Sequence, residues 1–311
     1  MRINNNQKFV LGLMTAAMLA APSAAQAQSK LSIEDFVGTI NWSQSSGDIT
    51  IDITRGADEV NLERNSGSDV QILGEFNKIK RVRCKGSDRH KRIKLKGVHT
   101  YKSLDKYPEL NIAVPANTEV VMHNSVPFVY GQPNVDIFDA DINGCAHIEV
   151  GDVTSHLYAD ISGAAKLTAG NIGEAELDLS GASELKAGNV SGPLKLHMSG
   201  ASQSQIGHAS NGLTYRSNGA SDGSIDSASG PISIKASGAS DVDIHGGKAS
   251  PMTVIASGAS GVTFKGAATD LEVKARGASD ISIDEISGTL KQTRSGASDI
   301  NIKRYKDVVG L

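Results

Sequence analysis

One four-residue stretch has the spacing of a known nucleophile motif. Ser183-Glu184-Leu185-Lys186 matches S-x-x-K, in which penicillin-binding enzymes place a serine and a lysine on one helical turn. The corresponding stretches elsewhere in the chain read SQSQ, SDGS and SDVD, so the lysine is not repeated with the serine. The surrounding residues alternate between apolar and polar, which is typical of a strand and places the two side chains out of helical register. We therefore interpret the match as structural.

A second pattern is a polar residue that recurs about every 19 residues: Glu184, Gln203, Asp222, Asp241, Asp280 and Asp299, with Gly261 interrupting the series. In parallel strands stacked about 4.8 Å apart, adjacent carboxylates could share a Ca²⁺ ion, which takes oxygen ligands. An aspartate beside a serine in a turn more often accepts hydrogen bonds from local backbone N–H groups, and we favour that interpretation. The serines one position earlier are interpreted as a ladder of hydroxyls. The histidines show no ligand spacing, so we expect no metal or cofactor.

A third candidate is the basic segment 78–96, KIKRVRCKGSDRHKRIKLK, in which ten cations accompany one aspartate. These cations are Lys78, Lys80, Arg81, Arg83, Lys85, Arg89, Lys91, Arg92, Lys94 and Lys96. Such a run could bind anionic partners such as lipopolysaccharide or an acidic polysaccharide. The alternative, which we favour, is the solvent face of a hairpin with Val82, Cys84, Ile93 and Leu95 pointing inward. The absence of interleaved aromatic residues argues against nucleic acid.

The elements that position these residues follow from a repeat. A glycine flanked by small residues occurs nine times, with successive spacings of 19, 18, 19, 19, 19, 20, 19 and 19 residues. The glycines are Gly144, Gly163, Gly181, Gly200, Gly219, Gly238, Gly258, Gly277 and Gly296. A catalytic motif would occur once, whereas a motif at a fixed period indicates architecture. We number each repeat from this glycine, which is position 0.

Residues on both sides of the glycine alternate with a period of two. Apolar residues occupy positions −6, −4 and −2, as in Leu194, Leu196 and Met198, and positions +4 and +6, as in Val242 and Ile244. Two short strands therefore meet at a bend, where we expect the alanine at +1 to point into a narrow corner. A unit this short cannot bury its apolar face alone, so the coils must stack. We predict an all-β, parallel β-solenoid with about 19 residues per coil and two main sheets, right-handed because six-residue periodicity is absent.

Cys84 and Cys145 are the only cysteines. Two cysteines in an oxidising compartment could pair. Cys145 also stands where the other repeats have the +1 alanine, and we favour a buried thiol at that small-residue position.

The beginning of the chain has the pattern of a secretory signal peptide over residues 1–27. Arg2 and Lys8 precede an apolar run from Phe9 to Ala21, and Ala25-Gln26-Ala27 forms a small-x-small cleavage site. No later segment approaches 18 consecutive apolar residues, so we expect no transmembrane segment in the mature chain. The net charge of −3 gives no global field that attracts nucleic acid. We predict an exported protein that is periplasmic, associated with the outer membrane, or secreted.

Tandem small-Gly-small-Ser/Asp motifs ending in SGASDI resemble the family named "putative auto-transporter adhesin, head GIN domain". The segments GDITIDITRGADEVNLE and LNIAVPANTEVVMHNSVPFVYG are similar to its strand-Pro-strand segments. The resemblance covers nearly all of the mature chain and is weaker from Gly74 to Tyr107. The Gly-Ser-Gly-like turn motif of the family has alanine at its centre here. The resemblance implies a β-helix like the pectin-lyase superhelices and a role in cell adhesion, with no catalytic residues.

We divide the mature chain into irregular β coils or a cap over residues 28–135 and regular repeats over residues 136–311. We expect a non-enzymatic surface or envelope protein that binds cell-surface glycan, lipopolysaccharide or protein. A Ca²⁺-dependent polysaccharide lyase is the enzymatic alternative, because such enzymes use this architecture, and a purely structural envelope role is the third. At the last coil we expect either self-association into a homo-oligomer or blunting of the edge by Lys303, Arg304 and Lys306.

Overall fold

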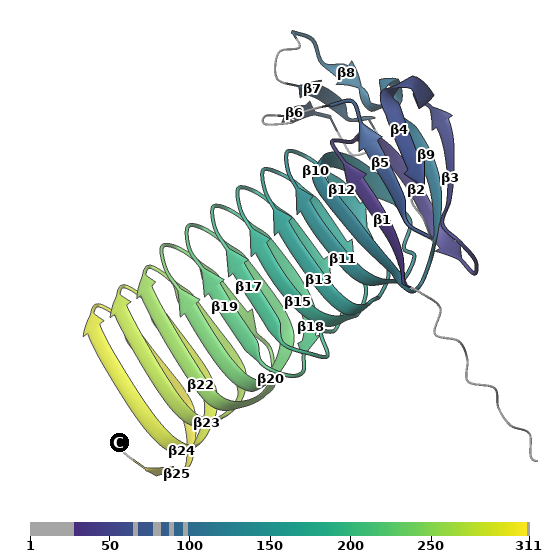
Figure 1. Ribbon diagram of the computed structural model, residues 1–311. Coiled ribbons are helices and arrows are strands. Elements are labelled where there is room, and N and C mark those ends of the chain that lie inside the picture. The colour runs from purple at the N-terminus through teal and green to yellow at the C-terminus, as the bar shows by residue number, and fades with distance from the viewer. Residues whose placement is uncertain (1–27, 65–67, 77–81, 87–89, 96–98, 310–311) are drawn as a thin grey trace, which may run out of the picture.

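The computed structural model describes residues 28–64, 68–76, 82–86, 90–95 and 99–309, so the predicted signal peptide lies outside it. The chain forms a parallel β-solenoid of about 10 turns that extends away from an irregular N-terminal end (Figure 1). The predicted fold class and coil length are confirmed, since coil after coil pairs in parallel with the residue 18 to 20 positions along the chain. No helix in the described ranges is long and apolar enough to cross a membrane.

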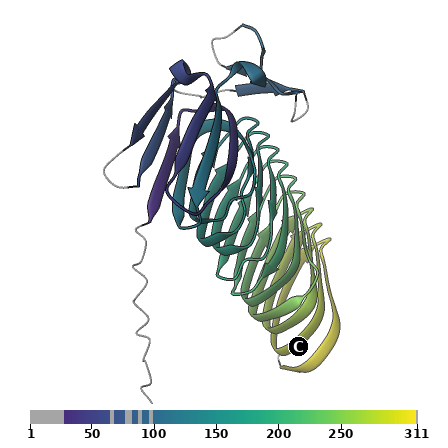
Figure 2. The ribbon, with the colours of Figure 1, turned by 90° about the vertical axis from the view of Figure 1, so that its right-hand side faces the viewer.

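The regular coils contribute strands to two long sheets. Sheet one contains positions −6 to −2 and includes β11 (Val135–Ile142), β13 (Val153–Ile161), β15 (Ile172–Leu179), β17 (Leu194–Met198) and β19 (Leu213–Ser217). Sheet two contains positions +3 to +6 and includes β12 (His147–Glu149), β14 (Lys166–Ala169), β16 (Glu184–Ala187), β18 (Gln203–Ala209) and β21 (Asp241–Ile244). Three longer strands run through both sheets: β20 (Asp222–Ala236), β23 (Gly261–Gly277) and β24 (Asp280–Gly296). β22 (Gly247–Gly258) continues sheet one, and β25 (Asp299–Val309) continues sheet two. The oblique view in Figure 2 shows successive coils staggered one behind another.

The N-terminal half continues the stack in an order that differs from the sequence. Its strands are β1 (Ser29–Glu34), β2 (Val37–Ser45), β3 (Thr50–Arg55), β4 (Val60–Arg64), β5 (Val70–Gly74), β9 (Glu109–Pro115) and β10 (Thr118–Tyr130). β10 pairs in parallel with β1 and β2 on one side and with β11 and β12 on the other. β1 and β2 pair in turn with β5 and β9, and the antiparallel strands β3 and β4 form the outer margin. The first coil in the sequence is therefore enclosed between two later segments.

A separate antiparallel sheet contains β6 (Val82–Lys85), β7 (Arg92–Leu95) and β8 (Lys102–Ser103). Two 3-10 turns, Ala57–Glu59 and Leu104–Lys106, complete the N-terminal half. The three-stranded sheet lies beside the first regular turns of the solenoid (Figure 1).

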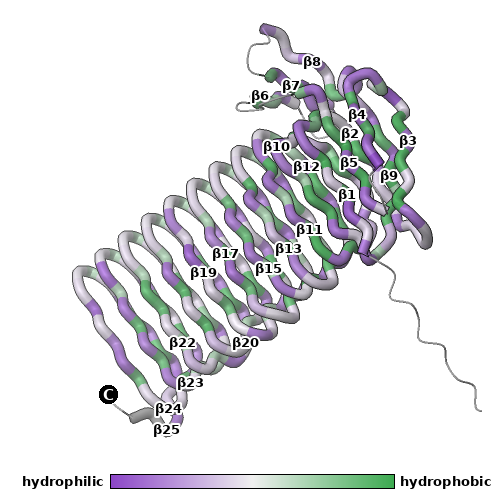
Figure 3. The backbone as a smooth tube through the Cα atoms, in the orientation of Figure 1, coloured by the Kyte–Doolittle hydropathy of each residue, from purple (hydrophilic) through white to green (hydrophobic). Residues whose placement is uncertain are grey.

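Inward-facing residues occupy the even positions of each repeat, including the bend. Before the last coil, positions −6, −4, −2, +4 and +6 are buried as predicted, apart from the half-buried Ala187, and the resulting alternation of hydropathy along the strands is visible in Figure 3. The expectation for the +1 alanine is wrong: Ala182, Ala201 and Ala220 are exposed, whereas the serines at +2 are at least 93% buried. The left-handed glycine turns the chain without changing which face the even positions occupy. The corner is therefore filled by serine.

The bend accepts only glycine. All nine repeat glycines have a positive φ, which is +74° in Gly200. Residues with a Cβ atom rarely adopt this conformation. A Cβ atom on Gly200 would also lie 2.5 Å from the carbonyl oxygen of Gly181 in the preceding coil. Stacking brings these backbones together, because the N–H of Ala201 donates to that same carbonyl at 2.6 Å.

Most of the buried serines bind the bend, whereas Ser183 has no hydrogen-bond partner among the described residues. Ser202, Ser240 and Ser279 each donate to the carbonyl three residues earlier at 3.0 Å. Their hydroxyls therefore do not form the simple ladder that the sequence suggests, although Ser217 does donate to Ser240. A buried hydroxyl without such a partner would destabilise the fold.

The last coil carries polar residues where earlier coils have core residues. Gln292 and Arg294 are exposed, although the residues with which they pair in the preceding coil, Val273 and Ala275, are buried. Lys303 is paired with Asp284, and Arg304 and Lys306 are paired with Glu285 of the preceding coil. Inward-facing polar residues and charges are common devices against edge-to-edge pairing.

Candidate binding surfaces

The basic hairpin presents four cations on one face. Arg83 lies opposite Lys94, and Lys85 lies opposite Arg92, across the antiparallel pair β6–β7. Val82, Cys84 and Leu95 pack against the core and Ile93 is fully buried, so the predicted inward set is confirmed. We call Arg83, Lys85, Arg92 and Lys94 the basic face. Lys78, Lys80, Arg81, Arg89 and Lys96 lie outside the described residues, and Lys91 precedes β7.

The described residues provide no counter-ions for the basic face. Within the described part of the chain, none of its four cations has a carboxylate within ion-pair distance. Like charges directly opposite each other across a strand pair are destabilising. Two such pairs on one small sheet therefore reduce its stability in the absence of an anion.

An aromatic ring that the sequence reasoning missed belongs to this face. The Lys85 and Lys94 ammonium groups lie 4.7 Å and 5.9 Å from the centroid of the Tyr101 ring. The Arg92 guanidinium donates to the Tyr101 carbonyl at 3.2 Å. Tyr101 lies five residues beyond the basic run, so only the pairing of β7 with β8 brings it there. It separates two ammonium groups and orients them on one side of the hairpin.

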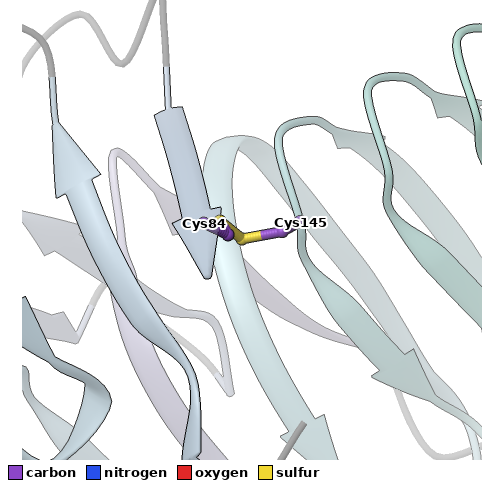
Figure 4. The surroundings of a disulfide bond; sticks show 2 residues. All are labelled: Cys84 and Cys145. Atoms are coloured by element: carbon purple, nitrogen blue, oxygen red, sulfur yellow. A yellow bond between two sulfur atoms is a disulfide. The ribbon is translucent and has the colours of Figure 1, made fainter. Parts of the chain in front are cut away.

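A disulfide between Cys84 and Cys145 attaches the hairpin to the solenoid (Figure 4). The favoured interpretation of Cys145 as a buried core thiol is wrong, because position +1 points outward in this bend. Cys145 is covered because the hairpin lies over it, and Val82 contacts Gly144 beside it. The outward-facing +1 position thus brings Cys145 within reach of Cys84 on the hairpin.

The acidic column on sheet two is stacked as predicted. Glu184, Gln203, Asp222, Asp241, Gly261, Asp280 and Asp299 pair successively in register. A groove of about 570 Å³ lies over four of these coils, lined by Glu184, Lys186, Gln205, Asp222, Asp241 and Asp243 among others. Asp241 accepts from the backbone N–H of Gly261 at 3.0 Å, and Asp299 accepts from that of Ile300. The Asp299 bond is of the local backbone type that we favoured, whereas the Asp241 bond joins one coil to the next.

Two charged residues of the groove pair with each other. Across the described ranges, no three His, Cys, Asp or Glu side chains are grouped as metal ligands. Lys186, the lysine of the S-x-x-K match, lies on a strand and is paired with Glu184 at 3.0 Å. Glu184 also binds Lys166, and these two lysines lower the pKa of its carboxyl group.

A further charged surface lies on the outer side of sheet one, at position −3. Pairing in register places Asp141, Asp160, Asp178, His197, Arg216 and Lys235 in one row. The row changes sign once, between Asp178 and His197, which are paired at 3.1 Å. A depression of about 450 Å³ covers this point. We call these six residues the charge-divided row.

The charge-divided row also escaped the sequence reasoning, which followed the apolar positions and the +3 column. Reading position −3 through the repeats would have found three acids followed by three bases. Burial and the neighbouring carboxylates Asp141 and Asp178 raise the pKa of Asp160. Exposed Tyr158 lies beside the row, with its ring stacked on His156 at 5.7 Å.

No family model matches the chain, and no curated protein matches it. Among solved structures, the chain is similar to the crystal structure of a "putative adhesin" from Bacteroides fragilis. The identity is 15%, the alignment covers 90% of this chain and 92% of that one, and the TM-score is 0.24.

Proposed function

We propose that this protein is an exported surface protein that binds anionic glycan through its basic face. The observation that carries the proposal is the pair of opposed cations, Arg83 with Lys94 and Lys85 with Arg92, without neutralising carboxylates among the described residues. A ligand with regularly spaced carboxylates or phosphates would remove the repulsion and gain charge-assisted hydrogen bonds. The disulfide fixes this face at the solenoid, which serves as a rigid scaffold.

Lipopolysaccharide phosphates and polysaccharide carboxylates share this chemistry. The ligand-binding role requires no chemical step, and the exported location rests on the signal pattern of residues 1–27. The stacked coils present a long surface on which adhesive contacts could form, and this is consistent with a role in adhesion.

The test compares wild type with the double variant Arg83→Ser/Lys94→Ser in binding to immobilised polygalacturonate and to lipopolysaccharide. Lys248→Ser/Lys265→Ser is the matched control, because it removes two exposed cations from the solenoid. We expect the apparent Kd of the first variant to rise at least about tenfold, and its salt dependence to weaken. Tighter binding of wild type to polygalacturonate would identify carboxylate as the recognised group, and tighter binding to lipopolysaccharide would identify phosphate. Equal loss in both variants, or no loss in either, would overturn the proposal.

A further inference from the structure

The charge-divided row has a symmetry that is unusual for a solvated face. Its acids Asp141, Asp160 and Asp178 are followed, coil by coil, by the bases His197, Arg216 and Lys235. We propose that this face binds a second copy of the chain in an antiparallel, two-fold symmetric dimer. The proposal is independent of the glycan-binding role of the basic face.

The geometry follows from one symmetry operation. A two-fold axis that runs along the strand direction, midway between β15 and β17, places sheet one of each copy face to face. It reverses the order of the coils and leaves position −3 opposite position −3. Asp178 then faces the partner's His197, Asp160 faces the partner's Arg216, and Asp141 faces the partner's Lys235. Each contact occurs twice.

At the neighbouring positions as well, the two-fold axis brings no like charges opposite each other. At position −5, Glu176 faces the partner's Lys195, while Tyr158 and Asp139 face the uncharged Thr214 and Ser233 of the partner subunit. Two strands farther out, Glu34 of β1 faces the partner's Lys274 of β23. No pair of like charges results at these positions.

Other arrangements of the same face are unfavourable. Moving the axis by one coil toward the N-terminus places Asp160 opposite the partner's Asp178. Moving it by one coil toward the C-terminus places His197 opposite the partner's Arg216. An axis along the solenoid would place every acid opposite itself. Like carboxylates oppose the first and third arrangements, and the second leaves Asp160 opposite the partner's uncharged Ile255, so each is less favourable than the proposed register.

The outer members of the row lack partners within the chain. Glu176 binds Lys195 and Asp178 binds His197 across the centre, each at 3.1 Å. In contrast, Asp141, Asp160, Arg216 and Lys235 make no ion pair or hydrogen bond with any residue in the described ranges. Burial and two neighbouring carboxylates raise the pKa of Asp160, as expected for an acid that lacks a cation. A second copy supplies the missing charges.

The size of the face sets the expected affinity. Six strands about 4.8 Å apart and about six residues of about 3.3 Å each give roughly 600 Å² per copy. This area is near the lower limit for specific protein interfaces, and its contacts are polar. We therefore expect a reversible dimer that dissociates in high salt.

Sedimentation equilibrium of the full mature chain tests the proposal between about 1 and 200 μM protein, at low and high salt. The variants are Asp160→Arg, Arg216→Asp and the combination of both, with Asp226→Arg as a control at an exposed position of β20 outside the charge-divided row. Each single variant places like charges opposite each other and should raise the dimer Kd at least about tenfold. The combination restores opposite charges and should return the Kd to within about threefold of wild type.

Misfolding cannot imitate this pattern, because each single reversal places the new charge between opposite charges of its own chain. Circular dichroism melts should therefore show single variants at least as stable as wild type. A wild type that is monomeric throughout would overturn the proposal. A dimer that both single variants retain would also overturn it and would locate self-association elsewhere, for example at the last coil.

Discussion

The phenol oxygen of Tyr215 occupies the space that a side chain on Gly223 would need. Tyr215 is fully buried on sheet one, and a Cβ atom on Gly223, on the opposite sheet two, would overlap that oxygen. The coils on either side carry Leu196 or Ile234 at the position of Tyr215. The next coil carries Val242 at the position of Gly223. One large residue thus replaces part of the core contribution of the facing sheet.

This relationship predicts a compensating pair. Gly223→Val alone should destabilise the coil by about 2–4 kcal/mol, because the added side chain forces Tyr215 from its position. Gly223→Val with Tyr215→Ile reproduces the combination of the following coil and should recover at least half of the loss. Chemical denaturation of the two variants measures the difference. Equal destabilisation of the single and double variants would contradict the packing account.

The repeat glycine should resist even the smallest substitution. Gly200→Ala should cost about 2 kcal/mol or more, because its positive φ and the close backbone of Gly181 both exclude a Cβ atom. Gly246→Ala is the control, since its nearest neighbour would be 3.7 Å away and its φ is not positive. Thermal unfolding should separate the two variants clearly. Similar melting temperatures would show that the bend is not specific for glycine.

The disulfide should matter locally. Cys84→Ser/Cys145→Ser removes a link across 61 residues, for which the chain-entropy model gives about 4 kcal/mol. The small sheet β6–β8 has few other attachments, so amide exchange in β6 and β7 should accelerate at least about tenfold. Exchange in β22 and β23, which pair along their whole length, should not change. Ala164→Ser, a substitution at the same position of the next bend, controls for the added hydroxyl. Acceleration throughout the solenoid would mean that the bond supports the whole fold.

Asp160 should make stability depend on pH. Burial and the neighbouring carboxylates Asp141 and Asp178 raise its pKa above the ordinary value of 3.8, so ionisation disfavours the folded state. This penalty is fully present above the raised pKa and disappears as the pH falls below about 3.8. Asp160→Asn should therefore raise the melting temperature by about 1–3 °C at pH 7 and have no effect at pH 3. Melts at about 1 μM protein keep the chain monomeric, and Asp226→Asn is the control. A lower melting temperature at pH 7 would contradict the assignment.

The sequence predicts the regular coils well because their signals are local. Nine glycines at a fixed period, with alternating apolar residues such as Val242 and Ile244, specify the bend, the strands and the stacking together. The errors arise at the bend itself. A left-handed glycine maintains the even positions facing inward, so serine and not alanine fills the corner, and Cys145 becomes available to Cys84.

The binding surfaces are harder to predict because they depend on pairing between distant segments. Tyr101 joins the basic face only through the pairing of β7 with β8, and no spacing in the sequence indicates it. The charge-divided row is recorded in the sequence at position −3. Its six residues can be recognised as one surface only when the strands are known to pair in register.

The enclosed first coil has a consequence for the order of folding. Each regular coil finds its neighbour within about 19 residues, whereas Ser29 of β1 pairs with Thr118 of β10 at a separation of 89 residues. Closing the longer loop costs more chain entropy and slows folding. The coils that follow in the sequence can therefore nucleate on one another, and β1, which precedes them in the chain, is among the last to take its place.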